Sequence, residues 1–179
     1  MKKENKHLLF MFIRYLVILA VAIPNLFLFY SIFTPLTIYP VNAVLNLLYG
    51  SSINGNIITS SAFSIEIIEA CVAGSAFYLL FLLNFATPMN TKKRVYSLIF
   101  SLLLFLVVNI ARIVIFAMLL SISFKLFDIT HTVTWYFVSG VIVFLVWIFT
   151  IRTFKIKETP FSTDIKFIYS KTKPTQRKK

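Results

Sequence analysis

The chain has 179 residues, of which 59% are hydrophobic and only 13% are charged. Soluble domains usually carry about 25% charged residues. This chain therefore lacks the polar surface that would keep a globular domain in water. The composition excludes an ordinary soluble domain and predicts an integral membrane protein.

The formal net charge of +12 is concentrated at the ends of apolar segments. Basic residues precede the first apolar run, interrupt the chain at 92–94 and recur through the stretch from Arg152. Such clusters mark cytoplasmic loops, whereas a nucleic-acid-binding protein carries them on one water-facing surface. The pattern predicts a multi-pass protein of the cell membrane, surrounded by lipid, with both termini in the cytoplasm and no nucleic-acid partner.

Four apolar segments are long enough to cross a membrane, which takes about 20 residues in a helix. They cover approximately residues 8–33, 70–87, 95–124 and 132–151. Arg14 lies near the cytoplasmic end of the first segment, where a long side chain can reach the headgroups. Pro24 lies in the middle of the same segment and predicts a kink.

The residues between the first two spans predict two smaller elements. Residues 35–49 are apolar but too short to cross, and two prolines interrupt them, so we expect a short amphipathic helix in the outer interface. Asn54-Gly55 is a turn signal, and residues 63–68 alternate as in a strand. Because open strand edges are not tolerated in hydrocarbon, the strands should lie outside the membrane.

The predicted fold is therefore an all-α membrane protein. It is a bundle of four transmembrane helices with a short interfacial helix and a small extracytoplasmic β-hairpin-like cap. Residues 1–154 form a single transmembrane domain, and residues 155–179 form a basic cytoplasmic tail that is largely disordered. The chain has one cysteine, so it forms no internal disulfide, and a structural zinc site lacks ligands.

Cys71 is the first candidate for chemistry, because it lies at the outer, N-terminal end of the second span. The partial positive charge of a helix N-terminus favours the thiolate, which is the nucleophilic form. Taken alone, however, a single cysteine in an apolar protein is more often a small core residue.

Arg112 lies inside the third span, where a charged residue is costly. At 1.5 Å per residue it is about 25 Å from the cytoplasmic end of that span, in the outer part of the bilayer. Asn109 is on the same helix face. The alternative to a catalytic role is that Arg112 extends its side chain to the headgroups or forms structural hydrogen bonds. His131 opens the fourth span at the outer face, and imidazole suits proton transfer at neutral pH.

These three residues come from different spans but are expected at a similar depth. Cysteine catalysis needs a nucleophile, a proton carrier and an oxyanion donor. We expect Cys71 to be the nucleophile, Arg112 to stabilise the oxyanion or the thiolate, and His131 to transfer protons. Possible supporting residues are Asn109, Glu69 and Ser75, and either Glu69 or Asp128 is suited to orienting His131. Neither a metal nor an organic cofactor is expected.

At these residues the chain resembles the exosortase/archaeosortase family. The matching stretches are Glu-Ala-Cys-Val-Ala-Gly-Ser at 69–75, Asn-Ile-Ala-Arg at 109–112 and Thr-His-Thr at 130–132, within residues 63–148. Many members place a small hydroxyl residue and a glycine directly after the cysteine, whereas this chain has Val72 and Ala73 there. In length it is similar to the compact, core-only members.

The resemblance implies a membrane-embedded cysteine protease or transpeptidase that acts at the outer face. Its substrates would be exported proteins whose C-terminal sorting signal has a short motif, a hydrophobic span and a basic tail. Cys71 would form a thioester with the substrate, and water or an amine acceptor would release the product.

Two other functions fit the same residues. The chain could be a non-enzymatic membrane protein, such as a transporter component or assembly factor, with Arg112 paired to an acidic residue of a partner. It could also be a lipid-modifying acyltransferase that carries a fatty acyl group on Cys71.

Overall fold

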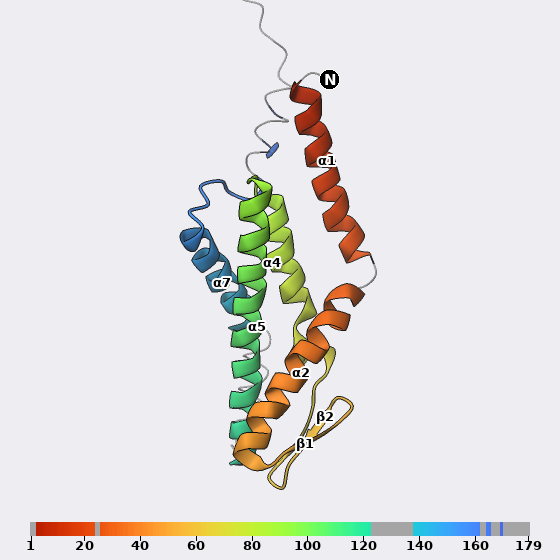
Figure 1. Cartoon of the computed structure of the whole chain (residues 1–179), viewed down its shortest axis with the longest axis vertical. Helices are drawn as coiled ribbons and strands as arrows, with labels where there is room; N and C mark the ends of the chain where they lie inside the picture. Colours follow the sequence, from red (N-terminus) through yellow and green to blue (C-terminus); the bar gives the residue numbers. More distant parts are fainter. Residues whose placement is uncertain (1–2, 24–25, 123–137, 162–163, 166–168, 170–179) are drawn as a thin grey trace, which may run out of the picture.

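The computed structural model describes residues 3–23, 26–122, 138–161, 164–165 and 169, with side chains from Leu8 onward. The chain is mostly helical, with one small antiparallel sheet (Figure 1). The helices are α1 (Lys3–Ala22), α2 (Phe27–Tyr49), α3 (Glu69–Val72), α4 (Gly74–Ala86), α5 (Thr91–Ser121) and α7 (Ser139–Thr153). The strands are β1 (Ser52–Asn54), β2 (Ile57–Thr59) and β3 (Ser64–Glu66).

Three helical segments are long and apolar enough to cross a membrane. They are α2, the combined segment Glu69–Ala86 and α5. The apolar parts of α1 and α7, Leu8–Ala22 and Ser139–Thr153, are shorter. The structure therefore supports a helical membrane protein, although its three sufficiently long helices do not establish four crossings. The predicted fourth span began at residue 132, and residues 132–137 lie outside the described part of the chain.

The boundaries predicted for the first span and the interfacial helix are wrong. Instead of one span over 8–33, α1 ends at Ala22, close before Pro24, and α2 begins at Phe27. Residues 35–49 are not a separate helix, because α2 continues through Pro35 and Pro40. Each of these prolines removes a single backbone hydrogen bond, and packing against neighbouring helices compensates for such losses in membrane proteins. Residues 35–49 thereby belong to a helix that is long enough to cross.

The predicted cap is present as a three-stranded antiparallel sheet in the order β1-β2-β3, one strand more than a hairpin. Asn54 pairs with Ile57, so Gly55 and Asn56 form a two-residue turn, and Gly55 has a φ of 60°. Such tight hairpin turns need left-handed backbone, which glycine adopts without strain. Ile58 is fully buried beneath the sheet, which fastens the sheet to the end of the bundle.

Aromatic side chains from three helices form the centre of the bundle. Phe33 of α2 stacks on Phe77 of α4 with ring centroids 3.6 Å apart, and Phe77 meets Phe105 of α5 edge-to-face at 4.8 Å. Phe77 is completely buried. Because large rings lock adjacent helices in one relative position, this cluster holds α2, α4 and α5 together.

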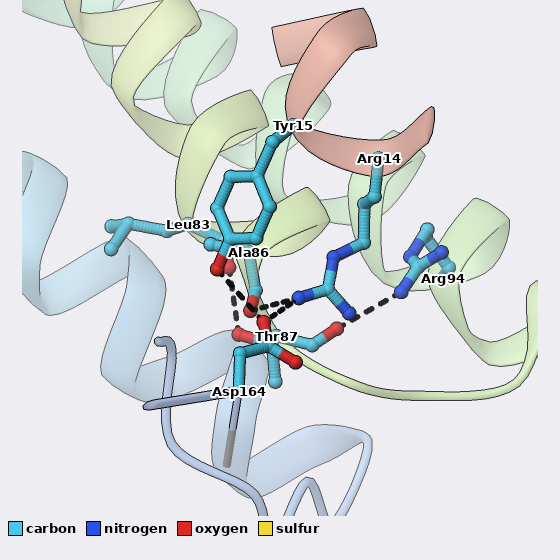
Figure 2. Close-up of polar contacts among 7 residues, drawn as sticks. All are labelled: Arg14, Tyr15, Leu83, Ala86, Thr87, Arg94 and Asp164. Carbon is cyan, nitrogen blue, oxygen red and sulfur yellow. Dashed lines mark hydrogen bonds and ion pairs between the residues drawn. The ribbon is translucent and has the colours of Figure 1, made fainter. Parts of the chain in front are cut away.

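The segment after α7 is fixed to the bundle by a buried carboxylate (Figure 2). Asp164 forms an ion pair with Arg14 of α1, and it accepts a hydrogen bond of 2.8 Å from the hydroxyl of Tyr15. The side chains of Arg14 and Asp164 are only 11% and 3% exposed. Arg14 also donates to the carbonyl of Ala86 at the end of α4. Thus Asp164, which lies in the tail predicted to be largely disordered, joins α1, α4 and the C-terminal segment.

Candidate functional site around Cys71

A break in the helical backbone lies immediately after Cys71. The expected continuous span from residue 70 is divided, because α3 ends at Val72 and Ala73 adopts a left-handed conformation with φ 59° before α4 begins at Gly74. A non-glycine residue in this region carries strain of about 1 kcal/mol or more. The break makes the carbonyl groups of Cys71 and Val72 available to donors from other helices.

Two polar side chains of α5 use these carbonyls. Asn109, which is 2% exposed, donates to the carbonyl oxygens of Cys71 at 3.0 Å and Val72 at 3.3 Å. Arg112, one turn further along α5, donates through Nη2 to the carbonyl oxygen of Cys71 at 3.2 Å. The cysteine backbone is thus held by a neutral amide and a guanidinium from one helix face.

The other branch of the Arg112 guanidinium reaches α7. Its Nη1 donates to Oγ of Ser139 at 2.7 Å. Arg112 therefore links three separate elements, α3, α5 and α7. These hydrogen bonds offset part of the cost of placing a charge within an apolar helix. Ser139 was not among the site residues expected from the sequence. The sequence shows it only as a hydroxyl residue ahead of the apolar residues that form α7.

A cavity of about 430 Å³ lies beside the cysteine. Residues on both sides of Cys71 in the chain line it, together with Tyr30 of α2 and Ser139 of α7. Glu69 and Ser75, both expected as supporting residues, also line this cavity and are exposed. The cavity is large enough for an extended stretch of a few peptide residues or a small acceptor. Tyr30 carried no sequence signal, because it is one of several aromatic residues in its apolar segment.

Gly74 permits the close approach of α2 and α4 at the edge of this cavity. A Cβ atom on Gly74 would lie 2.6 Å from Cε1 and 2.7 Å from Cζ of the Tyr30 ring. A rigid ring cannot swing its far end away, so Gly74→Ala should lower the free energy of unfolding by about 1–3 kcal/mol. Thermal unfolding in detergent measures this effect.

Gly140→Ala is the matched control, because a Cβ there meets no atom within 4 Å. Gly140 lies within α7, where alanine is favoured over glycine by about 0.5–1 kcal/mol, so this variant should be slightly stabilised. Gly74→Ala should cost less stability in a Tyr30→Ala background than in the unchanged protein, because the smaller side chain removes the clash. Equal stability of the two alanine variants would show that α2 and α4 do not approach this closely at Gly74.

The third expected catalytic residue, His131, lies outside the described residues, as does Asp128. Among the other expected residues, Glu69 and Ser75 line the cavity, whereas Arg112 and Asn109 contact the backbone of Cys71, which lies in the chain between the lining residues Ala70 and Ala73. Within the described ranges, no group of three or more His, Cys, Asp or Glu side chains is arranged to hold a metal ion.

The arrangement is suited to nucleophilic chemistry on an electrophile held in the cavity. A thiol lies where a fixed positive charge is within electrostatic reach, since Arg112 contacts the same residue. Guanidinium has five N–H donors, and the two hydrogen bonds described above use only part of that capacity. No protein-family model, curated protein or solved structure matches this chain. Its function must therefore be inferred from the chemistry of the site.

Proposed function

We propose that this chain is a membrane-embedded cysteine peptidase or transpeptidase of the exosortase/archaeosortase type. It acts on the C-terminal sorting signal of exported proteins at the outer face of the cell membrane. One observation carries the proposal: the single cysteine of the chain is held by Arg112 and Asn109 beside a cavity of about 430 Å³. A nucleophile, a cationic donor and room for a substrate are the parts that acyl transfer to a thiol requires.

In the proposed reaction, the Cys71 thiolate attacks the carbonyl carbon of the scissile peptide bond. The guanidinium of Arg112 stabilises the negative charge that develops on the carbonyl oxygen. His131 donates a proton to the leaving amine, the C–N bond breaks, and a thioester remains on Cys71. Water or an amine acceptor then attacks the thioester and transfers a proton back to His131, the C–S bond breaks, and the Cys71 thiolate is released.

The contacts of Arg112 favour this function over that of a non-enzymatic assembly factor. In the assembly-factor hypothesis, Arg112 pairs with an acidic residue of a partner within the bilayer. Here two of its five N–H donors form hydrogen bonds within the chain, to the Cys71 carbonyl and to Ser139, and these bonds direct the guanidinium toward the cysteine. An arginine that contacts the backbone of the only cysteine is well placed to stabilise negative charge that develops beside that cysteine.

The proposed topology has four spans, with both termini in the cytoplasm and the Cys71 cavity toward the outside. Figure 1 shows the start of α1 and the turn between α4 and α5 at one end of the molecule, and the sheet at the other. The α4–α5 turn leads into the basic residues 92–94, and the first basic cluster precedes the apolar part of α1. Positive charge at one end supports placing that end in the cytoplasm.

The thioester intermediate provides the direct test of the proposed function. We expect membranes that contain the full chain and its exported substrates to yield a Cys71 peptide carrying a covalent peptide adduct. Hydroxylamine should remove this adduct, because it cleaves thioesters. Mass spectrometry of the Cys71 peptide, before and after hydroxylamine, measures both results.

Cys71 is the only cysteine, so an adduct is assigned to it without a cysteine-free background. A Cys71→Ala variant should carry no adduct, whereas a variant at the sheet, Glu66→Gln, should carry the same amount as the unchanged protein. A fatty acyl adduct in place of a peptide would identify an acyltransferase and contradict the peptidase. Absence of any thioester while substrate processing continues would also contradict it.

A further inference from the structure

A second cavity, of about 280 Å³, lies at the end of the bundle that is opposite the sheet. Its walls are formed by the turn before α5 and by the segment that follows α7. Lys93 comes from the first wall, and Lys155, Lys157 and Glu158 come from the second. Nζ of Lys93 donates to the carbonyl oxygen of Lys155 at 3.4 Å, which joins the two walls.

The cavity is strongly cationic for its size, because three lysines line it against one glutamate. Asn90, the N-cap of α5, also lines it, and its side chain accepts a hydrogen bond from the backbone N–H of Lys93. The N-terminus of the 31-residue helix α5 therefore adds its partial positive charge at the same place. Ammonium groups combined with a helix N-terminus are a common setting for phosphate.

The backbone that carries the two exposed lysines of the second wall is anchored by contacts before and after it. At its start, the backbone N–H of Ile156 donates to the carbonyl of Ile151 in α7, and the Ile156 side chain is buried. At its far end lies the Asp164 contact with α1 shown in Figure 2. Because this backbone is fixed, binding of an anion by its lysines costs less conformational entropy than binding by a free tail.

The position of the cavity along α5 indicates which phosphate it meets. The apolar part of α5 begins at Val95, immediately after the basic residues, so the cavity lies at the level where apolar helix surface ends. Val95 and Tyr96 are 47% and 66% exposed, and Tyr96 lies one helical turn beyond Lys93. In a membrane this arrangement offers basic groups at headgroup depth and an apolar surface for an acyl chain below them.

We propose that this cavity binds the phosphate-bearing headgroup of an anionic membrane lipid. The phosphate oxygens accept hydrogen bonds from the ammonium groups of Lys93, Lys155 and Lys157, and an acyl chain lies along the exposed face of α5 at Tyr96. The site is separate from the Cys71 cavity, and it does not depend on the proposed reaction.

The test compares two double variants that remove the same charge. Lys155→Ala/Lys157→Ala removes two lining lysines, whereas Lys92→Ala/Arg152→Ala removes two exposed basic residues close by that do not line the cavity. The full chain, purified in an uncharged detergent, is titrated with phosphatidylglycerol or with phosphatidylcholine. Native mass spectrometry measures the bound lipid, and thermal unfolding confirms that each variant is folded.

We expect the unchanged protein to bind phosphatidylglycerol at least about tenfold more tightly than phosphatidylcholine. Loss of both lining lysines should weaken phosphatidylglycerol binding about 25-fold, at about fivefold for each basic residue at the headgroup surface, and the control pair should weaken it less than about threefold. Equal weakening by both pairs would overturn the proposal, because it would indicate diffuse surface charge. Equal binding of the two lipids would also overturn it. So would a site that prefers free phosphate: in that case 10 mM inorganic phosphate displaces the lipid, and phosphatidylglycerol raises the thermal stability of the chain no more than phosphate does.

Discussion

Replacing Cys71 by alanine should abolish processing of exported proteins while the chain still inserts and accumulates. In the proposed reaction the Cys71 sulfur forms the bond to the carbonyl carbon of the substrate, and the chain has no other cysteine. Removal of an enzyme nucleophile usually costs at least about 1,000-fold in rate. The change deletes one sulfur atom from a half-buried side chain, so the stability of the fold should change by about 1 kcal/mol or less.

The ratio of processed to unprocessed substrate in cells that express each variant measures this effect. Glu66→Gln is the control, because Glu66 is exposed on strand β3 and does not line the Cys71 cavity. The control should retain most of the activity. Normal processing by the Cys71→Ala variant would end the peptidase proposal and favour the non-enzymatic alternative.

A second measurement on the same cysteine tests the topology. A thiol reagent that does not cross membranes should modify Cys71 in intact cells from the outside, and it should not modify the Cys71→Ala variant. Modification only after the cells are opened would place the cavity on the cytoplasmic side, opposite to the proposed orientation.

Replacing Arg112 by glutamine should lower the processing rate by about 100- to 1,000-fold. This is the usual cost of removing one donor that stabilises a developing oxyanion. Glutamine keeps a hydrogen-bond donor. It loses the charge and the two terminal nitrogens through which Arg112 contacts both Cys71 and Ser139. Because a neutral residue inserts into the membrane more easily than arginine, failure to insert would not explain the loss.

Asn109→Ala separates the charge of Arg112 from its positioning role, since Asn109 donates to the same carbonyl but is neutral. Arg112→Gln should lower the processing rate more than Asn109→Ala does, because only Arg112 brings a positive charge to the developing oxyanion. Unchanged processing by Arg112→Gln, or equal effects of the two variants on processing, would contradict an electrostatic role for Arg112.

The membrane character and the distribution of charge could be predicted from the sequence, because each depends on residues that are close together in the chain. A long apolar run has few alternatives to crossing or lining a bilayer, whatever the rest of the chain does. The strands around Asn54-Gly55 are similarly local, since a tight turn and a short alternation suffice to specify them. The proximity of Asn109 and Arg112 on one helix face follows from helical periodicity alone.

The continuity of α2 through Pro35 and Pro40 could not be predicted in this way. A proline weakens a helix locally, and only packing of the helix against α4 and α5 decides whether the helix continues. The same argument applies to the break at Ala73, where contacts from Asn109 and Arg112 stabilise a backbone conformation that alanine adopts at a cost.

By itself, the sequence determined that this is a helical membrane protein with its basic residues at the helix ends, and it indicated which polar residues within apolar segments require a partner. Only the tertiary structure determined which residues those partners are. Arg112 meets Ser139, Gly74 meets Tyr30, and Asp164 meets Arg14 across 150 residues of chain. The physical reason is that burial makes an unpartnered polar group costly, whereas the choice among distant partners depends on how the helices pack.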